Sequence, residues 1–189
     1  MFYEETTDMN TIECIESRRS VRKFKDISVP TDVWCELIET ARYYPSWKHT
    51  QIARYHIISN PAIKENIANN CVCDFDFNAN TIKNAPALVV ISYVTERCGY
   101  ERDGSFSTSK EDRWEMFNAG IAAQTFCLAA HEMGIGTCIM GIFDEFKIAE
   151  VIGLPENQKV GVIIAAGYPD EEPDAPKRKA IEYLLTRYE

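Results

Sequence analysis

Two long apolar runs dominate the pattern of hydrophobic and polar positions. The run from Ala87 to Val94 (ALVVISYV) is almost continuously apolar and rich in β-branched residues, and Lys159 to Ala166 (KVGVIIAA) has the same character. Strands without polar alternation are covered on both faces, so both runs predict buried strands of a sheet. Shorter strands are expected at Tyr55 to Ile58 and at Thr137 to Ile142.

Helix signals alternate with these strands. Asn10 followed by Glu13 resembles a capping box, which predicts a short helix toward Arg18. A further helix is expected from Pro30, and Pro45 ends it. Others are expected over about 61–69 after an Asn-Pro pair, over 113–133, and from Asp144 to Gly153. Helices that alternate with about four strands predict an α+β or α/β layer protein, with a central β-sheet flanked by helices.

The helix over 113–133 is predicted to be the buried central helix, because its segment AGIAAQTFCLAA is apolar nearly all round. No repeat or linker divides the chain, so residues 1–189 are interpreted as a single domain. The polar stretch 96–113 is interpreted as a loop or a lid. The polar segment from Pro169 ends in the apolar IEYLL over 181–185.

Composition and charge exclude several classes of protein. Hydrophobic residues make up 46% of the chain and charged residues 26%, which is ordinary for a globular protein and excludes intrinsic disorder. The net charge of −9 argues against a non-specific nucleic-acid binder. No run approaches the ~18 apolar residues of a membrane span. The start MFYEETTDMN lacks the features of a signal peptide, so a cytoplasmic location is expected.

The cysteines do not predict a metal site or a disulfide framework. Their number is odd, and most of them lie in apolar stretches, which suits reduced buried thiols. Cys71 and Cys73 are separated by one residue, unlike a zinc knuckle, and the three histidines are far apart. The seven cysteines are Cys14, Cys35, Cys71, Cys73, Cys98, Cys127 and Cys138.

A basic run, SRRSVRKFK from Ser17 to Lys25, is the sharpest local signal in this acidic chain. Guanidinium groups match phosphate oxygens in bidentate fashion, and a serine hydroxyl adds a further contact. A second cationic cluster covers 177–179, and the two clusters could converge on one anion. The alternative is a solvated charged turn. Gly134-Ile-Gly136 lacks a third glycine and follows a helix, so it does not predict a Rossmann turn.

The segment Pro45 to Gln51 (PSWKHTQ) joins a helix to a strand. Its aromatic, hydroxyl and amide groups could line a planar heterocycle, and the alternative is an ordinary connecting loop. Trp47 could stack on a flat substrate or pack beneath the loop.

Together these motifs resemble the nitroreductase family of FMN-dependent flavoproteins. The run from Ser17 to Phe24 is similar to the family's R-R-S-x-R-x-F, and Ala41 to Ser46 is similar to its A-x-x-A-P-S. The other matching segments follow in family order: Asn84-Ala85-Pro86 before the buried strand, Ala119 to Gln124, Met133 to Cys138, Gly141, Leu154-Pro155, and Ala166 to Pro169.

The resemblance implies an α+β nitroreductase-like fold that forms an intertwined homodimer, with FMN bound between the two subunits. It implies that residues 169–189 extend to the partner subunit. The implied cofactor-binding residues are Arg18, Arg19, Ser20 and Arg22 at the phosphate and pyrimidine edge, Arg178 at the phosphate, Pro45, Ser46 and Trp47 from the partner with Gln51 nearby, and Ile139, Met140 and Gly141 along the ring edge.

The implied activity is transfer of hydride from NADH or NADPH, through FMN, to nitroaromatic, quinone or similar electron-poor acceptors in ping-pong turnover. No catalytic side chain and no metal are implied. Two alternatives remain open: a specialised flavin dehydrogenase or dehalogenase on the same fold, and a flavin-binding protein without turnover. The chain departs from the family pattern at His49, Ile52-Ala53 and Thr125, which lie around the implied flavin pocket.

Overall fold

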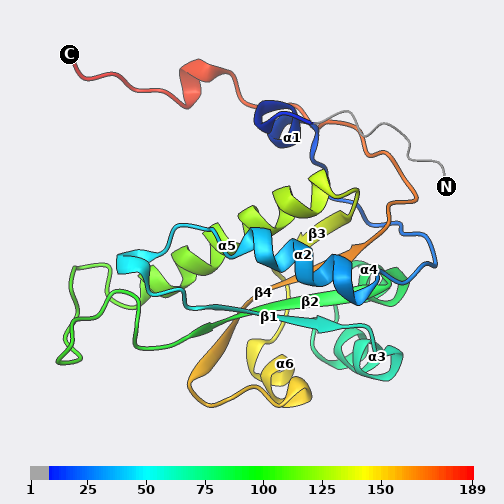
Figure 1. Ribbon diagram of the computed structural model, residues 1–189, viewed down its shortest axis with the longest axis horizontal. Helices are drawn as coiled ribbons and strands as arrows, with labels where there is room; N and C mark the ends of the chain where they lie inside the picture. The colour runs from blue at the N-terminus through cyan, green and yellow to red at the C-terminus, as the bar shows by residue number, and fades with distance from the viewer. Residues whose placement is uncertain (1–8) are drawn as a thin grey trace.

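The computed structural model describes residues 9–189, so most of the acidic start interpreted above lies outside the described residues. Four strands form one sheet in the order β1-β2-β4-β3, with every neighbouring pair antiparallel (Figure 1). The α+β class and the four strands are therefore confirmed. The strands are β1 (Ala53–Ile58), β2 (Ala87–Val94), β3 (Gly136–Met140) and β4 (Gln158–Gly167).

Helices cover both faces of this sheet (Figure 1). α2 (Thr31–Ala41) and α5 (Arg113–Glu132) pack on one face. α3 (Pro61–Asn70), α4 (Asp76–Asn84) and α6 (Glu145–Ile152) pack on the other. The strand β2 shows why its sequence carries no polar alternation: Val89 and Ile91 join the core beneath α5, whereas Leu88 and Val90 join the opposite core.

The predicted helix boundaries have observable causes. Asn10 and Glu13 form the reciprocal capping box at the start of α1 (Thr11–Ser17). The side chains of Asn60 and Asp144 accept hydrogen bonds from the first amides of α3 and α6. At the end of α6, Gly153 adopts the left-handed conformation (φ 62°) that commonly ends a helix.

The helix α4 was not predicted, because its sequence DFNANTIKN has few apolar residues and no strong period. It forms where Ala79 and Ile82 are buried against α3 and the sheet, so tertiary packing overrides a weak local signal. The short 3₁₀ segments η1 (Trp47–His49) and η2 (Ile181–Tyr183) were not predicted either, because three residues are too few to show a helical pattern of apolar positions.

The stretch between β2 and α5 is a folded loop anchored to the body. The carboxylate of Glu115, itself buried in the first turn of α5, accepts a hydrogen bond from the amide of Glu96 at 2.5 Å. Cys98 is fully buried, and the rings of Tyr100 and Phe106 lie 4.9 Å apart. Burial raises the pKa of the Glu115 carboxyl. Whether the loop also acts as a lid stays a prediction.

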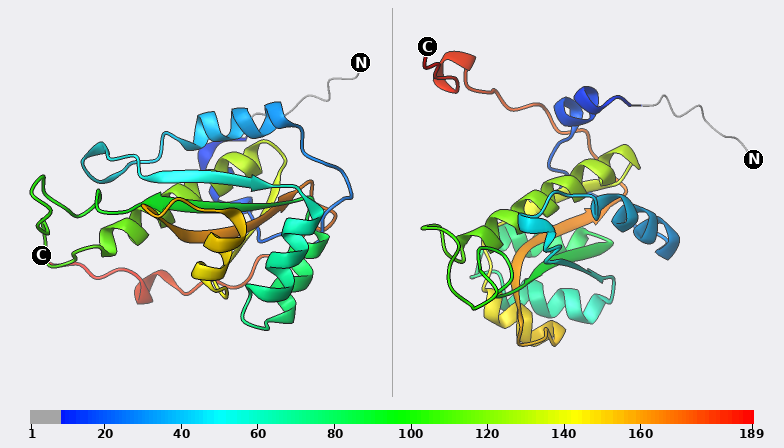
Figure 2. Two further views of the ribbon diagram at one scale, coloured as in Figure 1. Left: turned by 90° about the horizontal axis from the view of Figure 1, so that it is seen from below. Right: turned by 60° about the vertical axis from the view of Figure 1, so that its left-hand side comes forward.

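The C-terminal segment leaves the body of the molecule and runs outward from it, as Figure 1 and the right-hand view of Figure 2 show. Its apolar side chains are exposed, among them Tyr183 at 83% and Tyr188 at 94%. Phe117 on the outer face of α5 is 56% exposed. Within residues 9–189, no helix has the length and apolar character needed to cross a membrane.

Candidate functional site

The basic run lies along the free edge of the sheet, beside β3. Ser20 pairs with Thr137 in a parallel bridge, and the amide of Val21 donates to the Thr137 carbonyl at 3.0 Å. The sequence explains this path, because Val21 and Phe24 are buried in the core while the residues between and before them face outward. Beyond this bridge the run leaves β3, and Phe24 pairs with Pro169 just after β4.

A glycine permits this close approach. A Cβ atom built on Gly136 would lie 3.0 Å from three side-chain carbons of Val21, which is tighter than ordinary van der Waals contact. Gly136 therefore lets the basic run come close to β3. As a result, the structure brings the basic run to β3, which ends at Ile139 and Met140 and is followed by Gly141.

A cavity of about 550 Å³ opens at the start of β3, and its lining combines the cationic Arg18 and Arg19 with the acidic Glu171, Glu172 and Asp174. His131 contributes a ring whose Nε2 lies 2.8 Å from the hydroxyl of Ser17. The Thr137 hydroxyl is buried and has no hydrogen-bond partner among the described residues. The guanidinium groups of Arg18 and Arg19 are the groups of this cavity that suit an anion with several acceptor oxygens.

Electrostatics agree with this placement. Burial raises the pKa of the Cys138 thiol, and the positive charges of Arg22 and Arg18 act in the opposite direction. Burial lowers the pKa of His131, and the charge of Arg18 lowers it further. The guanidinium groups of Arg18 and Arg22 therefore lie close enough to β3 to act on Cys138, and the carboxylate of Glu171 acts on the same thiol in the opposite sense.

Beyond the cavity, the side chain of Arg22 lies across exposed surface near the end of β3. Its guanidinium donates to the Ser20 carbonyl at 3.1 Å and lies 5.5 Å from the centre of the Phe77 ring. Ile139 is 45% exposed, and Gly141 is exposed as well, whereas Met140 is buried. The exposed end of β3, with Arg22 beside it, is therefore a surface on which a planar ring could bind.

Two residues of this region were missed by the sequence analysis. Phe77 lies beneath Arg22, and the buried amide of Asn78 donates to the Ile142 carbonyl at 3.0 Å. Both come from α4. Their only sequence signal was an aromatic and an amide in a segment without a clear period, so nothing could have singled them out.

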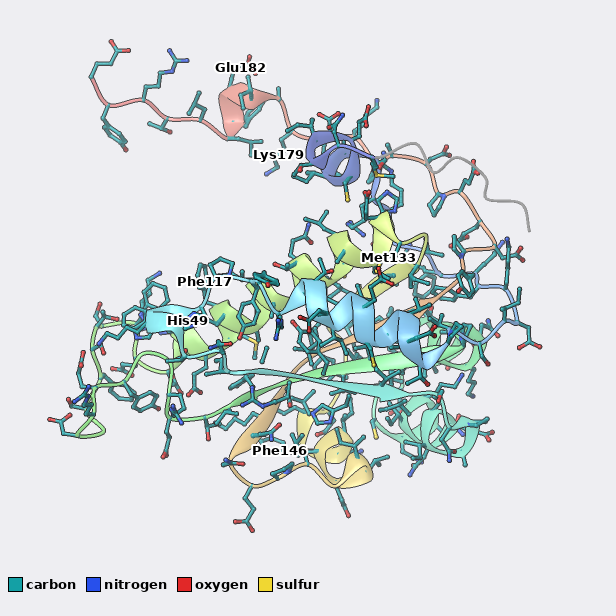
Figure 3. The ribbon with its side chains drawn as sticks, viewed as in Figure 1. His49, Phe117, Met133, Phe146, Lys179 and Glu182 are labelled. Carbon is teal, nitrogen blue, oxygen red and sulfur yellow. The ribbon has the colours of Figure 1, made fainter. Side chains whose placement is uncertain are left out.

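The segment Pro45 to Gln51 lies at the opposite end of the molecule. The amide of Trp47 donates to Asn118 near the start of α5, whereas Ser17 contacts His131 near its end. Thirteen residues of helix separate these two anchors, which corresponds to about 20 Å. Figure 3 shows the same separation, with His49 and Phe117 at one end of α5 and Met133 at the other. One chain therefore does not bring the two predicted halves of the site together.

This segment has a defined structure of its own. The hydroxyl of Ser46 accepts a hydrogen bond from the amide of Gln51 at 3.0 Å. The indole of Trp47 packs at 4.7 Å from that of Trp114, and its buried Nε1 has no partner among the described residues. Trp47 thus packs beneath the loop in the isolated chain, while Pro45 is exposed and Ser46 partly so.

Arg178 lies in the exposed C-terminal segment. Its guanidinium donates to the Pro176 carbonyl, and within residues 9–189 it forms no hydrogen bond or ion pair with the basic run. Figure 3 places the neighbouring Lys179 and Glu182 on this outward segment, away from the sheet. Convergence of the two cationic clusters stays a prediction.

The seven cysteines are all free thiols, five of them buried. Burial raises the pKa of Cys98 to about 11 and also raises the pKa of Cys127. Thiols with raised pKa values are poor nucleophiles at neutral pH. Among residues 9–189, no group of three or more His, Cys, Asp or Glu side chains is arranged to hold a metal ion.

Comparisons with known proteins agree with the fold. The family model described as "Nitroreductase family" matches residues 15–168. A relative from Bacillus subtilis strain 168, provisionally named NAD(P)H nitroreductase YfhC, is 28% identical over 188 residues, covering 92% of each chain. A solved structure described as an FMN-dependent nitroreductase from Clostridium difficile R20291 is 27% identical, with a TM-score of 0.73, covering 94% of this chain and 98% of that one. A nitroreductase family protein from Streptococcus pneumoniae TIGR4 has a TM-score of 0.82 at 20% identity, covering 95% and 100%, and shows likeness of fold.

Proposed function

The chain belongs to the nitroreductase family of oxidoreductases, and on that basis we propose that it binds FMN and transfers hydride from NADH or NADPH to electron-poor acceptors. The proposed acceptors are nitroaromatic compounds, quinones and similar molecules. The observation that carries the proposal is the pairing of the basic run with β3, where Ser20 forms a parallel bridge with Thr137 and the amide of Val21 donates to the Thr137 carbonyl.

The residues present fit FMN. Its phosphate would lie in the cavity at the start of β3, held by Arg18 and Arg19, where the unpartnered Thr137 hydroxyl offers a further donor. Arg178 is proposed to reach the same phosphate from the C-terminal segment. Ser20 lies between this cavity and Arg22, so it is placed to contact the ribityl chain.

The ring of FMN would lie along the exposed end of β3, with backbone amides of Ile139, Met140 and Gly141 facing its edge. FMN, when bound, supplies the hydride-transfer chemistry. Arg22 places a fixed positive charge beside the pyrimidine edge, where negative charge develops on reduction, and a preorganised cation stabilises such charge. We assign no side chain the role of nucleophile or general acid, because this chemistry requires neither.

A second copy of the chain would complete each site. Pro45, Ser46, Trp47 and Gln51 are about 20 Å along α5 from the basic run of their own chain, so we propose that they serve the site of the partner. The exposed apolar side chains of residues 181–188 and the exposed Phe117 on α5 offer apolar surface for the interface. β1 pairs with one neighbour only within the described residues, so it has a free edge for a partner strand.

An absorbance spectrum of the purified protein tests the proposal. We expect a yellow protein with non-covalent FMN, bleached by NADH or NADPH and restored by a quinone or a nitroarene. Bound FAD, or no uptake of excess FMN, would contradict the cofactor assignment. Bleaching without reoxidation by any such acceptor would favour a flavin-binding protein or a more specialised flavin enzyme.

Sedimentation tests the assembly. A dimer that retains FMN is expected, because each site needs residues of both chains. A stable monomer that retains FMN at full affinity would contradict the shared site.

A further inference from the structure

The chain returns to the basic run directly after β4. The amide of Lys25 donates to the Tyr168 carbonyl at 2.9 Å, and the amide of Asp170 donates to the Lys23 carbonyl at 3.0 Å. Phe24 and Pro169 form an antiparallel bridge between these two pairs. The segment 168–170, which directly follows β4, therefore pairs with the outer end of the basic run.

Glu171 continues this pairing with its side chain. One carboxylate oxygen, Oε1, accepts the amide of Arg22 at 2.6 Å and the amide of Lys23 at 3.1 Å. Two successive amides that converge on one oxygen form a small anion-binding nest. Hydrogen bonds to an ionised acceptor are stronger than neutral ones, so this contact restricts the backbone at Arg22 and Lys23.

Hydrogen bonds therefore fix the backbone at Arg22 and at the residue before it. The preceding residue, Val21, is bonded to β3, and the amide of Arg22 itself is bonded to Glu171. With its backbone fixed, the Arg22 side chain reaches the Ser20 carbonyl and the Phe77 ring. Without Glu171, both amides lose this acceptor, and the last residues of the run lose one of their two supports.

We propose that Glu171 is a positioning residue for Arg22, which it holds at the end of β3 so that the guanidinium faces the pyrimidine edge of the flavin. This inference rests on the proposed function. In this proposal Glu171 acts through hydrogen-bond geometry, because one of its carboxylate oxygens accepts both amides. A glutamine offers the same acceptor oxygen without the charge, whereas an alanine offers neither.

The test compares Glu171→Ala and Glu171→Gln with wild type by FMN titration and by the midpoint potential of the bound flavin. Asp170→Ala is the matched control, since it removes a neighbouring exposed carboxylate whose backbone, not its side chain, pairs with Lys23. We expect Glu171→Ala to bind oxidised FMN about tenfold more weakly, the effect of one hydrogen bond to a charged group. Glu171→Gln should bind within about twofold of wild type.

The midpoint potential separates positioning from charge. A misplaced Arg22 stabilises reduced flavin less, so a further tenfold loss for the reduced form would lower the potential of Glu171→Ala by about 30 mV. Glu171→Gln should stay near wild type. Equal rises in potential for both variants would show a purely electrostatic role and overturn the inference.

Glu171→Ala behaving like Asp170→Ala, in a folded protein that binds FMN, would also overturn the inference. Failure of the wild type to bind FMN would instead overturn the proposed function, so the two failures are distinguishable.

Discussion

The substitution Gly136→Ala tests whether close packing of the basic run on β3 creates the cofactor site. The added methyl would meet Cβ, Cγ1 and Cγ2 of Val21, each at 3.0 Å. Van der Waals contact between carbons is optimal at about 3.5–4.0 Å, so the basic run must move outward by roughly half an ångström or more. Overpacking of this kind costs about 1–3 kcal/mol of unfolding free energy.

The movement should also affect binding, because the displaced segment carries Arg18, Ser20 and Arg22. Loss of one good hydrogen bond to the phosphate corresponds to about tenfold weaker FMN binding. The assay is an FMN fluorescence titration combined with urea denaturation of the flavin-free protein. We expect the affinity of the folded protein to fall, in addition to its stability.

Gly161→Ala is the matched control. Its added Cβ would lie 2.9 Å from the Ala119 side chain, a similar clash on β4 beneath α5 and away from the basic run. It should lower stability to a comparable extent and leave the FMN affinity of the folded protein unchanged. If Gly136→Ala lowers stability like the control but binds FMN at the wild-type affinity, contact between the basic run and β3 does not create the site.

Three other changes address separate parts of the structure. Arg18→Ala should weaken FMN binding by about 1.5–3 kcal/mol in a titration, and unchanged affinity would remove Arg18 from the site. Trp47→Ala should lower the unfolding free energy by about 3 kcal/mol in a thermal or urea melt, because Trp47 packs on Trp114. A variant of unaltered stability with a raised KM for aromatic acceptors would instead show that Trp47 contacts substrate. Burial raises the pKa of Glu115 above its ordinary 4.5, so the wild-type protein should lose unfolding free energy as pH rises above that value. The variant Glu115→Gln should not show this loss, and parallel stability-versus-pH profiles of the two proteins would contradict the prediction.

Much of the fold was predictable because its elements carry strong local signals. β2 has the bounds predicted from its apolar run, and the capping box of α1 and the Asp144 cap of α6 begin their helices as expected. α5 ends one residue earlier than predicted, at Glu132. These features depend on side chains within a few residues of one another, which is what a sequence pattern records.

The missed helix α4 depends on contacts outside its own sequence. Ala79 and Ile82 are buried against α3 and the sheet, and that burial has no local signature. The same limit applies to the site. The basic run was visible as a charge cluster, but its pairing with β3 joins residues more than a hundred positions apart. The contacts of Phe77, Asn78 and Glu171 with this region can be recognised only in the folded structure.

The length of α5 has a genetic consequence under the proposed assembly. Because the basic run and the Pro45 to Gln51 segment lie about 20 Å apart on one chain, each dimer would contain two sites, each built from opposite ends of two chains. A lesion in the basic run and a lesion in the other segment would then be complementary alleles. Co-expressed, the two inactive chains would form mixed dimers in which one site carries both lesions and the other carries none. Activity would return in a cell that contains no intact copy of the gene.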